Sequence, residues 1–158
     1  MRIPKFNMIV TTLLIILVIG GIGYYNRPVV GIPDGEIGLE IGVPAEHVLQ
    51  AGYPVVPLPV VLRLRNRTNA EIALRVKNPC QVFRYVVTTE NGDFVQAMPA
   101  DTVCTQQIAT NIIRAQENIE ELKQVPLDAQ RYQPGPYQLH IKYWNYTAIE
   151  PFRLVANQ

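Results

Sequence analysis

From residue 58 onward, apolar and polar side chains alternate with a period of two, and this pattern constrains the fold more than any other feature. The alternation is clearest in 60–65, 72–77, 83–87 and 137–143. A period of two places every second side chain on one face of a β-strand, whereas a helix repeats every 3.6 residues. The sequence therefore predicts seven to nine short strands, with weaker ones at 94–98, 106–113, 119–125 and 149–155. A single helical turn at 119–125 is the alternative there.

Turn signals separate these segments at regular intervals. They are Asn66 to Asn69, Asn78-Pro79, Asn91-Gly92 and 134–136. Asn-Gly between two strands is the strongest short-range signal for a tight hairpin. Many short strands with turns at this spacing are typical of a sandwich. We therefore expect an all-β fold, an immunoglobulin-like antiparallel β-sandwich over residues 58–158.

The amino-terminal end carries an uncharged, apolar run from Phe6 to Tyr25, preceded by Arg2 and Lys5. About twenty residues at helical rise span roughly 30 Å, the thickness of one hydrocarbon core. We expect residues 1–25 to form a cytoplasmic stub and one transmembrane helix. Because the positive charges precede the run, the amino terminus should stay in the cytoplasm and the remainder should be extracytoplasmic, for example periplasmic. A cleaved signal peptide ending near 21–23 and a buried core helix are the alternatives.

Residues 26–57 are rich in proline and glycine, which excludes regular helix. Polar or small residues alternate with apolar ones in 36–41, as expected of an edge strand. We interpret 26–57 as a stalk that lies against the domain and adds its first strand. A loose linker is the alternative.

The chain has two cysteines, Cys80 and Cys104. Two cysteines in an exported domain are expected to form one disulfide. Closing this loop would add about 3.5 kcal/mol to the free energy of unfolding on the chain-entropy model. Two free buried thiols are the alternative, and a metal site is disfavoured by the distance of His47 and His140 in sequence.

Several short motifs follow one another in a recognisable order. They are Asn66, 72–76, Cys80, Phe83-x-Tyr85-x-Val87, Asn91-Gly92 with Val95, Cys104, Ile112 before Glu117, and 134–139. Over about residues 60–143 this order resembles the BsuPI-type intracellular proteinase inhibitor domain, an immunoglobulin-like sandwich. Exported members of that broader group often carry a cysteine pair in similar places. The resemblance implies inhibition of a protease, through an exposed loop such as 90–92 or 132–136.

The residues suited to catalysis are few. The chain has no serine and only two histidines, so a Ser-His-Asp hydrolase is excluded, and a four-ligand zinc site would need every cysteine and histidine. We interpret Glu117, Glu120 and Glu121 as a solvated acidic loop. A formal net charge of +1 argues against a nucleic-acid binder. We expect no enzymatic activity, no cofactor and no metal.

Two groups of residues are candidates for an interaction face. The basic group lies on the side of its strands away from the core: Arg63, Arg65, Arg75, Lys77 and Arg84. If the three strands are neighbours in one sheet, these cations form one patch for an acidic protein surface or anionic lipid headgroups. The aromatic group is Trp144 and Tyr146, with Trp144 directed outward toward a protein partner. A solvated outer face, and a Trp144 folded over the sandwich rim, are the respective alternatives.

These observations together predict a non-catalytic, single-pass membrane protein with an extracytoplasmic protein-interaction domain. It would act as an accessory subunit or modulator of a membrane complex, in contact with lipid through its amino-terminal helix. A BsuPI-type proteinase inhibitor is the alternative. A metal-handling assembly factor is a third class, which the scarcity of histidine and methionine argues against.

Overall fold

The computed structural model describes residues 36–49, 52–99 and 103–156. The expected transmembrane segment in 1–25 and the first part of the expected stalk lie outside these residues. Within the described ranges, no helix has the length and hydropathy needed to cross a bilayer.

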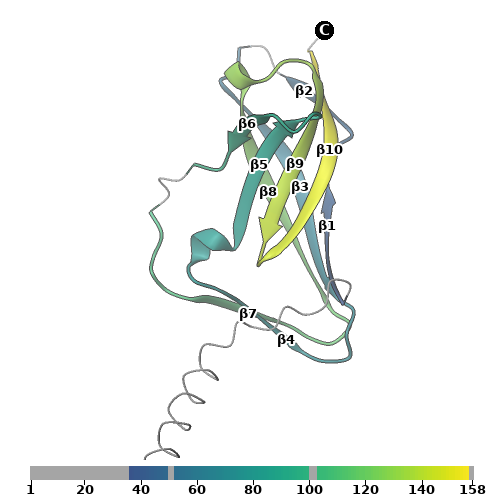
Figure 1. Cartoon of the computed structure of the whole chain (residues 1–158), viewed down its shortest axis with the longest axis vertical. Coiled ribbons are helices and arrows are strands. Elements are labelled where there is room, and N and C mark those ends of the chain that lie inside the picture. Colours follow the sequence, from purple (N-terminus) through teal and green to yellow (C-terminus); the bar gives the residue numbers. More distant parts are fainter. Residues whose placement is uncertain (1–35, 50–51, 100–102, 157–158) are drawn as a thin grey trace, which may run out of the picture. The chain divides into compact units, whose positions relative to one another are not determined.

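The described chain is built almost entirely from strands, which form two packed sheets and a small third sheet at one end (Figure 1). Sheet A has the order β1-β3-β8, sheet B the order β2-β10-β9-β5-β6, and the third sheet pairs β4 with β7. The strands are β1 (Ile37–Gly42), β2 (Glu46–Leu49), β3 (Val55–Asn66), β4 (Ile72–Val76), β5 (Phe83–Thr89), β6 (Phe94–Ala97), β7 (Ala109–Ile113), β8 (Asn118–Asp128), β9 (Gly135–Tyr143) and β10 (Tyr146–Ala156). Two 3₁₀ turns, η1 (Pro79–Gln81) and η2 (Ala129–Arg131), interrupt them.

The hydrophobic core lies between sheets A and B and follows from the period-two pattern. On β3, the alternate residues from Val56 to Leu64 are all buried. They face Leu139, Ile141 and Tyr143 of β9, which are buried as well. A fully buried aliphatic side chain contributes roughly 1.5–3 kcal/mol, so the two central strands supply much of the stability of the sandwich.

The all-β sandwich is confirmed, with differences in detail. The segment 119–125 is not a helical turn but part of the eleven-residue strand β8, and the strand expected at 106–113 is shortened to β7. The expectation of a purely antiparallel fold is wrong at one edge, because β2 runs parallel to β10. From β3 onward the described residues form eight strands, within the seven to nine expected, and β1 and β2 precede them.

The segment expected to be a stalk contributes to both sheets. Its predicted edge strand is present as β1, which pairs with β3 over six residues. A second strand, β2, joins sheet B, and β3 already begins at Val55. The compact unit therefore includes the described residues before 58, where the sequence pattern had placed the start of the sandwich.

Two polar residues hold the turns at the ends of the sandwich. The side chain of Asn66 is fully buried and donates to the carbonyls of Ala70 and Arg114, at 2.8 and 2.9 Å. The Tyr137 hydroxyl donates to the carbonyl of Gln133 at 2.9 Å and accepts from its N–H at 3.1 Å. Tyr137 therefore fixes the start of β9 to the loop that precedes it.

The predicted disulfide is confirmed. Cys80 in η1 is joined to Cys104, and their Cα atoms are 5.9 Å apart. The bond ties the connection between β4 and β5 to the segment that leads from β6 to β7.

Candidate protein-interaction face

The predicted basic residues do not form one patch. The condition for a single patch was that their strands be neighbours in one sheet, and the structure places those strands in three sheets. Arg63 and Arg65 lie on sheet A, Arg75 on the β4–β7 sheet with Lys77 just beyond it, and Arg84 on sheet B. Each sheet face therefore has to be considered separately.

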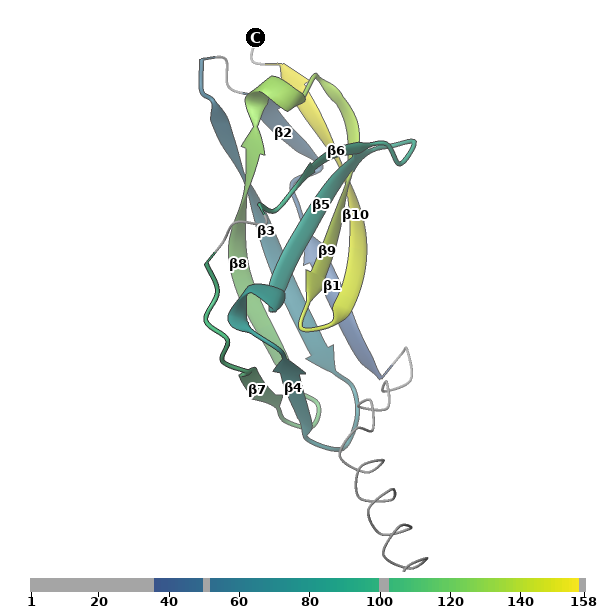
Figure 2. The ribbon, with the colours of Figure 1, turned by 60° about the vertical axis from the view of Figure 1, so that its left-hand side comes forward.

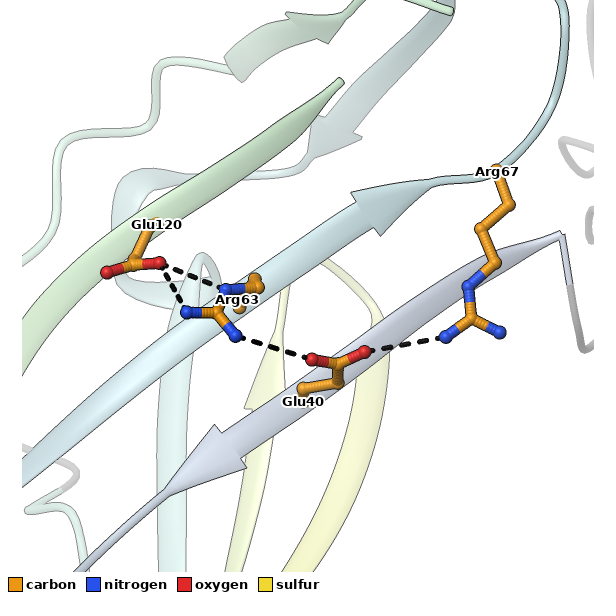
Figure 3. Close-up of polar contacts among 4 residues, drawn as sticks. All are labelled: Glu40, Arg63, Arg67 and Glu120. Carbon is orange, nitrogen blue, oxygen red and sulfur yellow. Dashed lines mark hydrogen bonds and ion pairs between the residues drawn. The ribbon is translucent and has the colours of Figure 1, made fainter. Parts of the chain in front are cut away.

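On sheet A, Arg63 is neutralised by acids on the two neighbouring strands (Figure 3). Arg63 stands between Glu40 of β1 and Glu120 of β8 in the strand register. It forms two hydrogen bonds with Glu120, at 2.8 and 3.0 Å, and an ion pair with Glu40 at 3.6 Å. Arg67 extends the row, at 3.4 Å from Glu40. The row Glu120–Arg63–Glu40–Arg67 is internally paired and offers little free charge to a partner.

The same row corrects the interpretation of the acidic cluster. Only Glu117 precedes β8, while Glu120 and Glu121 lie within the strand and point to opposite faces. Glu120 is an ion-pair partner of Arg63, and its proximity raises the pKa of that guanidinium. Glu121 faces inward and pairs with Lys123 at 2.7 Å. These carboxylates are therefore not a solvated loop.

The outward orientation considered for Trp144 is wrong, and the alternative, in which the strand ends at Tyr143 and Trp144 folds over the rim, is confirmed. Strand β9 ends at Tyr143, and Trp144 is only 7% exposed. Trp144 and Asn145 form the two-residue turn to β10, with φ values of 54° and 91°. Positive φ at both central residues is the geometry of a type I′ hairpin turn. The indole therefore packs over the rim, edge-on to Tyr143, and Tyr146 is half-buried.

A different face carries the most distinctive surface chemistry, namely the outer face of sheet B. The central strands β5, β9 and β10 place their outward side chains in register. One row contains Arg84, Lys142 and Thr147, and the next contains Val86, His140 and Ile149. Two cations thus stand directly opposite each other, beside an apolar row.

These rows line a shallow groove of about 760 Å³, which we call the sheet B groove. Its apolar floor includes Val86, 37% exposed, and Ile149, 57% exposed. Arg84 and Lys142 form its charged end, and no acidic side chain is among its described lining residues. His140, which also lines the groove, forms a hydrogen bond of 3.1 Å with the hydroxyl of the buried Thr88.

Sequence reasoning found one residue of the groove, Arg84, and missed Lys142, His140, Val86 and Ile149. The alternation does indicate that all five face away from the core. It does not indicate that β5, β9 and β10 are neighbours, and this adjacency is what assembles the groove. In the described ranges no group of three or more metal-ligating side chains is present.

Comparison with known proteins gives only remote likenesses. No protein-family model and no curated protein matches the chain. Among solved structures, the CARDB domain of the PF1109 protein from Pyrococcus furiosus is 13% identical, with a TM-score of 0.38 over 75% of this chain and 87% of that one. A β-glucosidase from Erythrobacter marinus is 13% identical, with a TM-score of 0.41 over 75% of this chain, and one from Listeria innocua is 11% identical, with 0.36 over 85%. This chain spans only 15% and 20% of those two enzymes.

Proposed function

We infer that the sandwich is of the immunoglobulin-like class. The order β1-β3-β8 follows strands A, B and E of that class, and β5-β9-β10 follows strands C, F and G. Tyr137 supports the assignment, because a tyrosine near the start of strand F, bonded to the backbone just upstream, is a feature of the class. A fold of this kind serves many functions, so the function has to be argued from the surface.

We propose that the chain is a non-catalytic, membrane-anchored protein-interaction domain, an accessory subunit or modulator of a membrane complex. Its docking site is the sheet B groove, and its partner presents an acidic segment with aliphatic side chains. The observation that carries this proposal is the pair Arg84 and Lys142, which face each other across neighbouring strands beside the apolar floor.

The electrostatics of this pair favour an acidic partner. Like charges directly opposite in a sheet are destabilising, and within the described lining no carboxylate offsets them. A carboxylate from a partner would relieve the repulsion and gain charge-assisted hydrogen bonds to the guanidinium of Arg84. Aliphatic side chains beside that carboxylate would cover Val86 and Ile149.

Binding of short peptides to the full chain in nanodiscs of zwitterionic lipid tests the proposal. We expect a peptide of alternating glutamate and leucine to bind more tightly than one of alternating lysine and leucine, or of glutamate and serine. Added salt should weaken the first interaction, because exposed charges are screened. Fluorescence anisotropy of a labelled peptide gives the dissociation constants.

Charge reversal locates the binding. Arg84→Glu combined with Lys142→Glu should weaken binding of the acidic peptide at least about tenfold, a loss of about 1.4 kcal/mol. Arg65→Glu, an exposed cation on sheet A, is the matched control and should leave binding unchanged. Equal binding of acidic and basic peptides, or equal effects of the two reversals, would contradict the proposal.

The membrane anchor and the extracytoplasmic location are part of the same proposal. They are supported by the apolar run from Phe6 to Tyr25 and by the Cys80–Cys104 disulfide, since such bonds persist in oxidising compartments. Protease added outside the cytoplasmic membrane of intact cells should remove a tag at the carboxyl end. A fully protected tag, in cells that lose it after lysis, would place the domain inside and overturn this part.

Inhibition of a protease is the second candidate, and one observation favours it. The β5–β6 hairpin has an exposed tip at Asn91 and Gly92, braced by a hydrogen bond from the N–H of Asp93 to the Thr89 hydroxyl at 3.1 Å. The other expected loop, 132–136, is less suited because Tyr132 is buried. Inhibition that is lost when the tip is replaced would support this candidate, and no inhibition across a protease panel would contradict it.

A further inference from the structure

Strand β8 is an edge strand of sheet A in the described structure. It pairs with β3 along its whole length and has no strand on its other side. Figure 2 shows β8 along one side of its sheet, with β3 beside it and β1 beyond. An edge strand presents a row of backbone N–H and C=O groups that can pair with another chain.

Three hydrogen bonds identify which residues of β8 present these groups. The backbone carbonyl of Glu117 accepts a hydrogen bond from the N–H of Asn66. The N–H and C=O groups of the odd-numbered residues of β8 are therefore directed toward β3. The carbonyl of Pro126 and the N–H of Asp128 are bonded by the side chain of Gln96, which belongs to sheet B. Since backbone groups alternate sides along a strand, residues 120, 122 and 124 direct their N–H and C=O groups to the free edge.

These positions allow one favourable antiparallel pairing of β8 with a second copy of itself. When the pairing is centred on Leu122, position 120 of each copy lies opposite position 124 of the other, and Leu122 lies opposite Leu122. The backbone N–H and C=O groups at these positions then face one another. The same register places Glu121 of each copy opposite Lys123 of the other. Moving the centre by one residue would place Glu121 against Glu121, or Lys123 against Lys123, and like charges opposite one another are destabilising.

We propose that the chain forms a symmetric homodimer through antiparallel pairing of β8, centred on Leu122. In such a two-fold interface residue i contacts j while j contacts i, and Glu121 with Lys123 satisfies this relation. Leu122 is 65% exposed on the outer face of sheet A, and the pairing covers it with Leu122 of the second copy. Pro126 ends the ladder, because it has no N–H and its carbonyl is already bonded to Gln96.

Charge exchange tests the register. Sedimentation velocity of the full chain in mild detergent should show a dimer for the wild type. Glu121→Lys and Lys123→Glu should each weaken self-association about tenfold or more, because each variant brings like charges together. The double variant should restore the dimer. An equimolar mixture of the two single variants should also restore it, because one chain then supplies two cations and the other two carboxylates.

The mixture separates the pairing between chains from the pair within a chain. Both single variants lose the 2.7 Å contact between Glu121 and Lys123 of the same strand, and mixing does not restore it. Recovery on mixing therefore reports only on contacts between copies. If the single variants sediment like the wild type, or if mixing restores nothing, the proposed register is wrong.

Cross-linking gives an independent test that does not depend on charge. Directly opposed residues of a hydrogen-bonded antiparallel pair have Cα atoms about 5.5 Å apart, within the range of a disulfide. Both native cysteines are already bonded to each other. Leu122→Cys should therefore yield a covalent dimer in isolated membranes under mild oxidation, whereas Ile149→Cys, on the exposed face of sheet B, should not. Equal cross-linking of both variants, or none from Leu122→Cys, overturns the proposal.

Discussion

The side-chain amide of Gln96 forms hydrogen bonds with the backbone of both Pro126 and Asp128, in the way that a neighbouring strand would. Its Nε2 donates to the carbonyl of Pro126 at 2.6 Å, and its Oε1 accepts from the N–H of Asp128 at 3.0 Å. Gln96 belongs to β6 in sheet B, whereas both partners belong to β8 in sheet A. One buried polar side chain therefore joins the two sheets at this end of the sandwich.

Removing the amide should destabilise the fold. Gln96→Leu removes two part-buried hydrogen bonds, to the Pro126 carbonyl and from the Asp128 N–H, and each such bond contributes about 0.5–1.5 kcal/mol. We expect the free energy of unfolding to fall by about 2 kcal/mol, measured by urea denaturation. Gln130→Leu, an exposed position in η2, is the control and should change it by less than about 0.5 kcal/mol. Equal stabilities of the two variants would show that the Gln96 bridge contributes nothing.

The turn at Trp144 should show an unusual order of substitutions. Trp144→Ala removes a buried ring and should cost about 3–5 kcal/mol. Trp144→Gly removes the same ring but tolerates the φ of 54°. The glycine variant should therefore be about 1 kcal/mol more stable than the alanine variant, the reverse of the order within a regular strand. Thermal and urea unfolding of both variants measure the difference, and an alanine variant at least as stable as the glycine variant contradicts it.

The same two variants test whether Trp144 takes part in binding. Because Trp144 is buried at the rim and is not part of the sheet B groove, neither substitution should change peptide affinity in samples that remain folded. A marked loss of affinity would return Trp144 to the interaction face.

The buried phenol of Tyr143 should make stability fall at alkaline pH. Burial raises its pKa to about 12 from an ordinary value of 10.0, and the nearby Glu121 carboxylate adds to the rise. Between these values the unfolded chain has released a proton that the folded chain retains. Ionisation of this group therefore leaves the free energy of unfolding unchanged below pH 10 and lowers it by up to about 3 kcal/mol as the pH rises through 12.

Tyr143→Phe removes the titrating hydroxyl and with it part of the alkaline loss of stability. Among the described residues the hydroxyl has no hydrogen-bond partner, so the variant should be at least as stable as the wild type at pH 8. Urea denaturation at pH 8 and pH 11.5 should show a smaller decrease for the variant. Some decrease should remain, because burial also raises the pKa of Tyr132. Identical decreases in both proteins would exclude Tyr143 as a cause.

Much of the strand content could be predicted because the signal is local. The alternation along β3, β4, β5 and β9 predicts which side chains face the core, and Asn91-Gly92 predicts where a hairpin forms. The turn at Trp144 and Asn145 shows the limit of such signals. It is also a tight turn, although Trp rarely adopts positive φ. There the packing of the indole decided the conformation against the local preference of the residue.

The amino-acid sequence by itself determined the all-β class, the inward and outward faces of most strands, and the pairing of the two cysteines. Only the tertiary structure decided that Arg63 is neutralised by Glu40 and Glu120, whereas Arg84 faces Lys142 in the sheet B groove. The reason is physical. The direction of a side chain along a strand depends on its immediate neighbours, but the identity of the adjacent strand depends on the free energy of packing residues that are far apart in the chain.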